Sequence, residues 1–172
     1  MRNYVPEHLT ILEPNQVLVF GTNASGFHGA GMAGLACRGD AQNTWRNDPW
    51  FLRAMKSSLG SSDRVGKWAV YGVSRGFQHG REGWSYGIET IHRPGLRRST
   101  PLPEILKQLV VLSRWADNLS QWTFLCYITG GGYNGWTREE MQGVYCDWFS
   151  SPCPPPNNIW IPEKMDPTKR IL

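Results

Sequence analysis

The side chains best suited to chemistry in this sequence lie within or beside glycine-rich stretches. Asn23 and His28 belong to "GTNASGFHGAG" (21–31), which follows an apolar run. His28 could titrate near neutral pH, or it could hydrogen-bond the loop backbone and fix its shape. Glu89 ends another apolar run, where a carboxylate could bind a hydroxyl group, act as a base or form a salt bridge. These three are the candidate catalytic residues, although no Ser-His-Asp order or paired-carboxylate motif accompanies them.

A second glycine-rich stretch, "TGGGYNGW" (129–136), stands in the same context as the first. Each follows an apolar run and precedes a segment with helical character. Glycine allows close approach of a ligand to the main chain, and a helix N-terminus adds unpaired N–H donors. If the two preceding strands are neighbours, the loops would face each other as a clamp for an anion. The alternative is two tight turns that only serve helix–strand packing.

Two common phosphate-binding motifs are excluded by spacing. The first loop lacks the Gly-Lys-Ser/Thr ending of a P-loop, so no lysine is provided for the terminal phosphates. The spelling GxGxxG occurs at 29–34, but a dinucleotide fingerprint needs it directly after the strand. The first loop is therefore a different kind of candidate site.

The elements that would position these loops alternate along the chain. Strands are predicted at 16–23, 67–74, 85–92, 122–128 and 158–163, and helices at 29–37, 48–60, 100–119 and 137–149. Asp48 and Pro49 mark one helix start and Gly60 its end, while Thr137 and Glu140 form a capping box. This order predicts an α/β fold with a mixed central sheet flanked by helices, and ligands beyond the carboxyl ends of its strands.

Composition limits the remaining possibilities. The 172 residues suit a single domain (1–172), and 40% apolar with 19% charged residues is typical of a globular protein. The net charge of +4 favours anionic partners. No apolar run is long enough to span a membrane, and the N-terminus lacks the core of a signal peptide, so we expect a cytoplasmic protein. The four cysteines, which we expect as free thiols, show no zinc-ligand spacing, so neither metal nor cofactor is predicted.

Four stretches together resemble a family of small bacterial and phage proteins with macrodomain-like folds. The family opens with FGSN, two variable residues and G-x-H-G-x-G-x-A, to which "VLVFGTNASGFHGAGMA" is similar. "GKWAVYGVSRGFQHGREGWSYGIET", "FLCYITGGGYNGWTREEM" and "NIWIPE" follow in the family's order. The resemblance covers nearly the whole chain and implies a three-layer macrodomain-like fold.

The resemblance also implies a ligand, because the wider macrodomain superfamily binds ADP-ribose and related nucleotides. Asn23 would touch the distal ribose or brace its loop, and Tyr133 would stack or close over the phosphates. A hydrolase of an ADP-ribosyl linkage would use Asn23, His28 and Glu89. The two loops would supply the remaining ligand-binding residues, largely through backbone donors: Gly21, Thr22, Gly29, Ala30, Gly31, Met32, Thr129, Gly130, Gly131, Gly132 and Asn134.

Two departures from the family pattern leave the ligand open. The family continues Pro-Thr-Lys after the "SYGI" strand, where this chain has Glu89, Thr90 and Ile91. Its second loop commonly carries a Cys-Gly or similar small pair instead of three glycines and Tyr-Asn. We therefore expect binding of an ADP-ribose-like nucleotide, free or attached to a macromolecule, with or without hydrolysis. The alternative is a nucleic-acid- or protein-binding module on the same scaffold, based on Arg93, Arg97 and Arg98.

Overall fold

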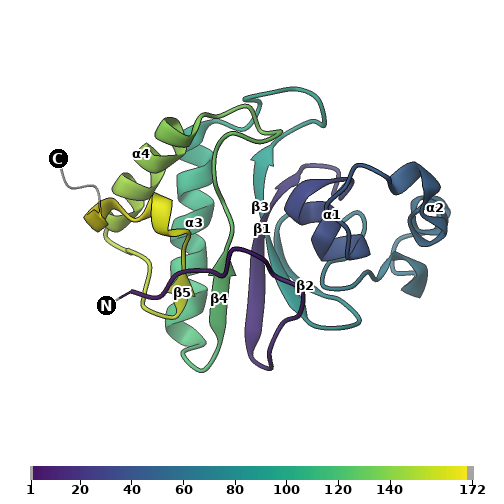
Figure 1. Ribbon diagram of the computed structural model, residues 1–172, viewed down its shortest axis with the longest axis horizontal. Coiled ribbons are helices and arrows are strands. Elements are labelled where there is room, and N and C mark those ends of the chain that lie inside the picture. Colours follow the sequence, from purple (N-terminus) through teal and green to yellow (C-terminus); the bar gives the residue numbers. More distant parts are fainter. Residues whose placement is uncertain (1, 170–172) are drawn as a thin grey trace.

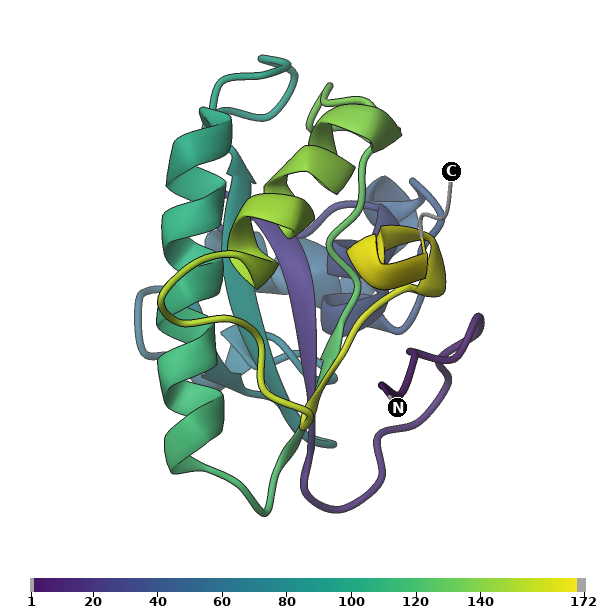
Figure 2. The same ribbon diagram turned by 90° about the vertical axis from the view of Figure 1, so that its left-hand side faces the viewer.

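The computed structural model describes residues 2–169, which form a five-stranded sheet between two layers of helices (Figures 1 and 2). The strand order is β2-β3-β1-β4-β5; β2 is antiparallel to β3 and all other neighbours are parallel. Helices α1 and α2 cover one face of the sheet, and α3 and α4 cover the other. The predicted three-layer α/β fold with a mixed central sheet is confirmed.

The regular elements follow one another in the predicted order. The strands are β1 (Gln16–Asn23), β2 (Gly76–His79), β3 (Trp84–Ile91), β4 (Thr123–Cys126) and β5 (Ile159–Trp160). The helices are α1 (Gly31–Arg38), α2 (Pro49–Lys56), α3 (Leu102–Asn118) and α4 (Arg138–Phe149). Among residues 2–169, no helix is long and apolar enough to cross a membrane.

Strand β1 is the central strand of the sheet, and its side chains pack on both faces of the sheet. Val17 and Val19 pack into the core beneath α3 and α4, whereas Leu18 and Phe20 pack into the core beneath α1. All four are buried, and β1 has parallel partners on both sides. A continuous apolar run is what such a doubly covered strand requires. Because β1 and β4 are neighbours, the loops that follow them leave the same edge of the sheet.

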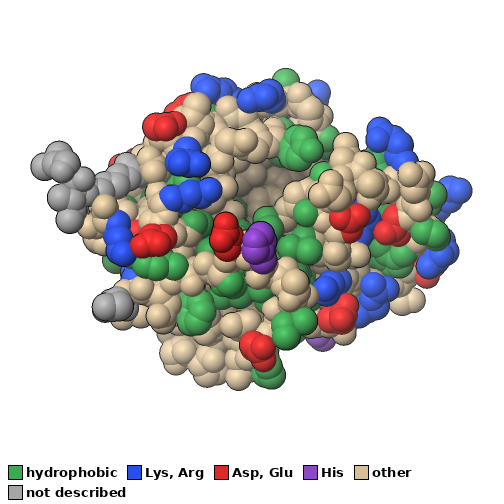
Figure 3. Space-filling model, viewed as in Figure 1, with side chains coloured by type: hydrophobic (Ala, Val, Ile, Leu, Met, Phe, Trp, Pro, Cys, Tyr) green, Lys and Arg blue, Asp and Glu red, His purple; other side chains and the backbone are tan. Residues whose placement is uncertain are grey.

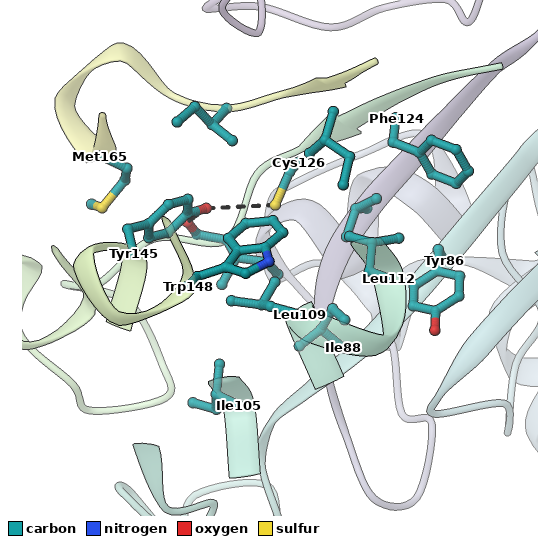
Figure 4. Packing of buried hydrophobic residues seen from close by; sticks show 14 of the residues in the cluster. Tyr86, Ile88, Ile105, Leu109, Leu112, Phe124, Cys126, Tyr145, Trp148 and Met165 are labelled. Atoms are coloured by element: carbon teal, nitrogen blue, oxygen red, sulfur yellow. Dashed lines mark hydrogen bonds between the residues drawn. The ribbon is translucent and has the colours of Figure 1, made fainter. Parts of the chain in front are cut away.

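The core beneath α3 and α4 fixes the point where the chain leaves β4 (Figure 4). The Tyr145 hydroxyl of α4 donates to the carbonyl of Ile128 at 2.7 Å and lies 3.5 Å from the Cys126 sulfur. Burial raises the pKa of Tyr145 well above its usual value, so the phenol keeps the proton that it donates. Helix α4 thereby anchors the start of the 129–136 loop.

One predicted strand is wrong. The sequence predicts a strand at 67–74, but the only ladder contact of this segment is a single bridge between Val65 and Val70. The N–H groups of Trp68 and Ala69 instead donate to the carbonyl of Ala36, at 2.7 and 3.0 Å. They cap the end of α1 and so are unavailable to a sheet. The strand lies further along as β2 (Gly76–His79), within the glycine-rich stretch that the sequence predicts as a connection.

The predicted helix starts agree with the structure better than the predicted helix ends do. Asp48 caps α2 by accepting from the N–H of Phe51 at 2.9 Å, and Thr137 and Glu140 form the predicted capping box of α4. Helix α2 ends at Lys56 rather than near Gly60, because the chain turns to extended geometry at Ser57. Similarly, β4 is shorter than the predicted 122–128, although the N–H of residue 127 still donates to β1.

Candidate functional site

A cavity of about 620 Å³ lies beyond the carboxyl ends of the parallel strands β1, β3 and β4. Its walls come from the β1–α1 loop, the β3–α3 loop, the β4–α4 loop and a segment at 43–46. These loops lie above the strand ends in Figure 1, and Figure 3 shows a hollow there between the two halves of the molecule. The site is therefore at the edge where α/β sheets bind ligands.

The two predicted glycine loops line this one cavity. Eleven of the predicted residues are in its wall: Gly21, Thr22, Asn23, Gly29, Ala30, Gly31, Met32, Thr129, Gly132, Tyr133 and Asn134. They come from segments far apart in the sequence that the β1–β4 pairing brings side by side. The remaining predicted residues, His28, Glu89, Gly130 and Gly131, lie outside the wall.

Gly130 and Gly131 shape the second loop rather than face the cavity. A β-carbon on Gly130 would overlap the carbonyl of Thr137, so the loop closes on itself only with glycine there. Gly131 has a φ of +85° and donates its N–H to the carbonyl of Trp136 at 2.8 Å. Both glycines serve the tight closure of the loop, and their expected contact with a ligand is corrected to this structural function.

His28 is corrected in the same way, from a catalytic candidate to a residue of the core. Its imidazole is fully buried, edge-on to Phe20, with Nε2 3.1 Å from the carbonyl of Val70. Burial lowers its pKa to about 4, so the ring is neutral at pH 7. It ties the first loop to the segment that precedes β2 and does not reach the cavity.

Glu89 lies on β3 but belongs to an ion-pair network on the α3 side of the sheet. Its carboxylate accepts from Arg75 at 2.8 Å and lies 3.0 Å from Nδ1 of His92. Burial alone would raise the pKa of Glu89, but the hydrogen bonds from His92 and Arg75, together with the positive charge of Arg75, lower it overall. The neighbouring Thr90 and Ile91, not Glu89, contribute to the cavity wall, so Glu89 is withdrawn as a catalytic candidate.

Asn23 lines the cavity, and its side chain braces the first loop from within. Its amide nitrogen donates to the carbonyl of Phe27 at 2.8 Å. Its oxygen accepts from the Ser25 hydroxyl at 2.8 Å and from the N–H of Phe27 at 3.0 Å. Most of its hydrogen-bonding capacity is used within the protein, so the structure supports the bracing interpretation of this residue.

The N-terminus of α1 presents free main-chain donors to the cavity. Ala30 occupies the N-cap and offers no side-chain acceptor, and the first turn contains no acidic residue. The N–H of Gly31 donates to Ala41, and that of Gly34 to Ala30. Within residues 2–169, the N–H groups of Met32 and Ala33 have no acceptor, and both residues line the cavity. Together with the helix dipole, these donors favour an anion at this wall.

The opposite wall is the β4–α4 loop, which the β3–α3 loop holds in place. Arg98 donates its N–H to Asn134 at 2.7 Å and its Nε to the carbonyl of Gly135 at 3.1 Å. It also pairs with Glu140 at 2.8 Å. The N–H groups of Gly132 and Tyr133 find no acceptor in the part of the chain that the structure describes. Donors thus stand on two sides of the cavity.

The wall at 43–46 is set by Arg38, a residue that sequence reasoning overlooked. The Arg38 side chain is 1% exposed, and one of its terminal nitrogens donates to the carbonyls of Gly29, Asp40 and Gln42, at 2.6 to 3.1 Å. This guanidinium joins the first glycine loop to the segment that carries Trp45. Gly34 leaves space for it, because a β-carbon there would lie 3.2 Å from the same nitrogen.

Sequence reasoning missed half of the wall, because most of these residues come from segments outside the two glycine loops. These residues are Phe27, Ala33, Asn43, Trp45, Arg46, Thr90, Ile91, Pro94, Gly95, Tyr127 and Ile128. Aromatic side chains are frequent among them, and the guanidinium of Arg46 lies 4.4 Å from the ring centre of Trp45. The dipeptide Trp45-Arg46 beside a helix start was the one available signal, since aromatic and arginine side chains together suit nucleotide ligands.

The cavity is electropositive and poor in acid–base groups. Arg46 is the charged residue in the described wall, and the described wall contains no Asp, Glu, His, Lys or Cys. The free N–H groups add partial positive charge. Such a wall suits an anionic ligand and offers little for proton transfer. Residues 2–169 also contain no cluster of three His, Cys, Asp or Glu side chains that could hold a metal ion.

No protein-family model, curated protein or solved structure matches this chain. The macrodomain-like resemblance therefore stands on the sequence motifs alone, and the function is inferred from the site.

Proposed function

We propose that the protein binds ADP-ribose or a related nucleoside diphosphate derivative in this cavity. The observation that carries the proposal is the convergence of two glycine loops, from the adjacent parallel strands β1 and β4, on one cavity with free main-chain donors on both sides. A diphosphate between the loops would accept from the N–H groups of Met32 and Ala33 on one side and of Gly132 and Tyr133 on the other.

The size and composition of the cavity agree with a nucleotide. Pockets for small molecules typically enclose about 300 to 1,000 Å³, a range that includes this cavity. Phe27, Trp45, Tyr127 and Tyr133 provide aromatic surface for a base or ribose. The resemblance to macrodomain-like proteins favours ADP-ribose within this class.

Binding is better supported than hydrolysis. Cleavage of an ADP-ribosyl linkage requires a positioned acid, base or nucleophile, and the described wall has no carboxylate, imidazole or thiol. Incubation with an ADP-ribosylated protein should therefore release no ADP-ribose beyond the rate seen without enzyme. Release that disappears in Asn23→Ala would show that the site is catalytic and would overturn this part of the proposal.

Calorimetric titration with ADP-ribose, NAD and ribose 5-phosphate tests binding. The informative variant is Gly132→Glu, because Gly132 lines the cavity and a β-carbon there meets nothing within 4 Å. Its carboxylate would repel a diphosphate, and we expect ADP-ribose affinity to fall at least tenfold with an unchanged melting temperature. The matched control is Gly143→Glu on α4, which is equally unobstructed and outside the cavity. Absence of binding to the wild type at millimolar ADP-ribose, or equal loss in both variants, would contradict the proposal.

A further inference from the structure

Three exposed arginines stand around the mouth of the cavity: Arg46, Arg93 and Arg97, which we name the arginine rim. Arg46 is part of the wall itself, and Arg93 and Arg97 flank Pro94 and Gly95, which line it. Arg97 also packs on the second glycine loop, since a β-carbon on Gly135 would lie 2.7 Å from its own. In Figure 3, Lys and Arg side chains follow the upper margin of the hollow, where Figure 1 places the β3–α3 loop.

The arginine rim is not neutralised by the protein. Within residues 2–169, none of its three side chains lies within 4 Å of a carboxylate, whereas Arg38, Arg75 and Arg98 each have such a partner. The unpaired cations of the rim thus gather at the opening of a cavity that already favours an anion. Their charge is available to anionic groups that lie outside the cavity.

The same margin carries an exposed aromatic ring that suits stacking, because Tyr133 is 72% exposed at the cavity wall. Trp45 lies beneath the guanidinium of Arg46. Arginines interleaved with aromatic rings are typical of surfaces that bind single-stranded nucleic acid, where phosphates meet the cations and bases stack on the rings. An acidic peptide would use the cations but not the rings.

From this arrangement we infer that the nucleotide bound in the cavity is attached to the end of a single-stranded nucleic acid. The inference rests on the proposed function, because the cavity holds the terminal ADP-ribose-like group. The arginine rim then contacts the phosphates of the adjoining nucleotides. The arginine rim increases the affinity for the nucleic acid and its salt dependence, without altering the contacts to the terminal group.

Fluorescence anisotropy with four probes tests this inference: free ADP-ribose in competition, a labelled single-stranded 10-mer with ADP-ribose on its terminal phosphate, the unmodified 10-mer, and an ADP-ribosylated peptide. We expect the modified 10-mer to bind at least tenfold more tightly than free ADP-ribose. The double variant Arg93→Gln/Arg97→Gln should lose that gain, keep its affinity for ADP-ribose within twofold, and reduce the slope of log affinity against log salt by about 1.4, since each single-strand phosphate contact contributes about 0.7.

The control removes the same charge elsewhere: Lys107→Gln/Arg114→Gln on the exposed side of α3 should leave all four affinities unchanged. Equal affinity for free ADP-ribose and the modified 10-mer would overturn the inference while leaving the proposed function intact. A rim-dependent gain for the modified peptide as large as that for the modified 10-mer would identify a protein carrier and overturn it as well. Binding of neither ADP-ribose nor the modified 10-mer would overturn both proposals.

Discussion

The β1–α1 loop is held by side chains buried beneath it, whereas the β4–α4 loop is held by a neighbouring loop at the surface. Asn23, His28 and Arg38 fix the first from inside, with the latter two almost fully enclosed. The second has internal bonds through Gly131 and Asn134, and Arg98, half of whose side chain is exposed, ties it to the β3–α3 loop. From this difference in burial we expect the first loop to be the more rigid half of the site.

Individual glycines also differ in the space around them, and the clearest contrast between the two loops is that of Gly26 with Gly132. In the first loop, Gly26 has a φ of +67°, and a β-carbon there would overlap the main chain of Gly72. In the second, Gly132 has open space around it. We expect Gly26→Ala to lower the free energy of unfolding by about 4 kcal/mol, from overpacking and left-handed strain together. Gly132→Ala should change it by less than about 0.5 kcal/mol. Urea unfolding measures both, and similar costs would refute the contrast.

The two arginines that brace the loops provide the next test. Arg38→Met leaves the carbonyls of Gly29 and Asp40 without their donor and should destabilise the fold by about 3 kcal/mol. Arg98→Met removes a partly exposed brace and should cost about 1 kcal/mol. Thermal and urea denaturation of the two variants give the comparison. A larger cost for Arg98→Met would mean that the second loop is the more firmly anchored one.

Acid should destabilise the folded protein through His28 of the first loop, by less than Gly26→Ala or Arg38→Met. The pKa of His28 is lowered to about 4 in the folded chain, below its unfolded value near 6.5, so the unfolded state binds the proton more readily. The stability from the neutral ring is complete above pH 6.5 and is lost as the pH falls toward 4. At pH 5 the loss relative to pH 7 is about 2 kcal/mol. His28→Gln should lack this part of the pH dependence in urea unfolding, and identical pH profiles would contradict the assignment.

The fold was predictable because its main signals are local. The apolar run at 17–20, the capping box at Thr137 and the amphipathic segment 102–118 each specify their own structure. The glycine loops were found because glycine marks close approach of backbone. Their convergence followed once β1 and β4 paired.

The burial and the contacts of individual side chains could not be predicted in the same way. His28 is buried because the segment around Val70 folds over it, and Glu89 is neutralised by Arg75, fourteen positions away in sequence. The wall at 43–46 depends on Arg38, which looks like an ordinary surface cation in the sequence. Each depends on contacts between segments that no local pattern marks.

The position of β1 has a further consequence for the order in which the protein assembles. Residues 16–19 pair with 123–126, and residues 17–23 pair with 84–91. The central strand can therefore pair only after residues much later in the sequence have been synthesised. Such distant pairing is slow because chain closure must precede it. The cavity is completed only after both pairings, when the second loop has been anchored by α4. A ligand that joins the two loops would therefore prolong the lifetime of the folded chain by slowing its unfolding, and would leave the rate of folding nearly unchanged.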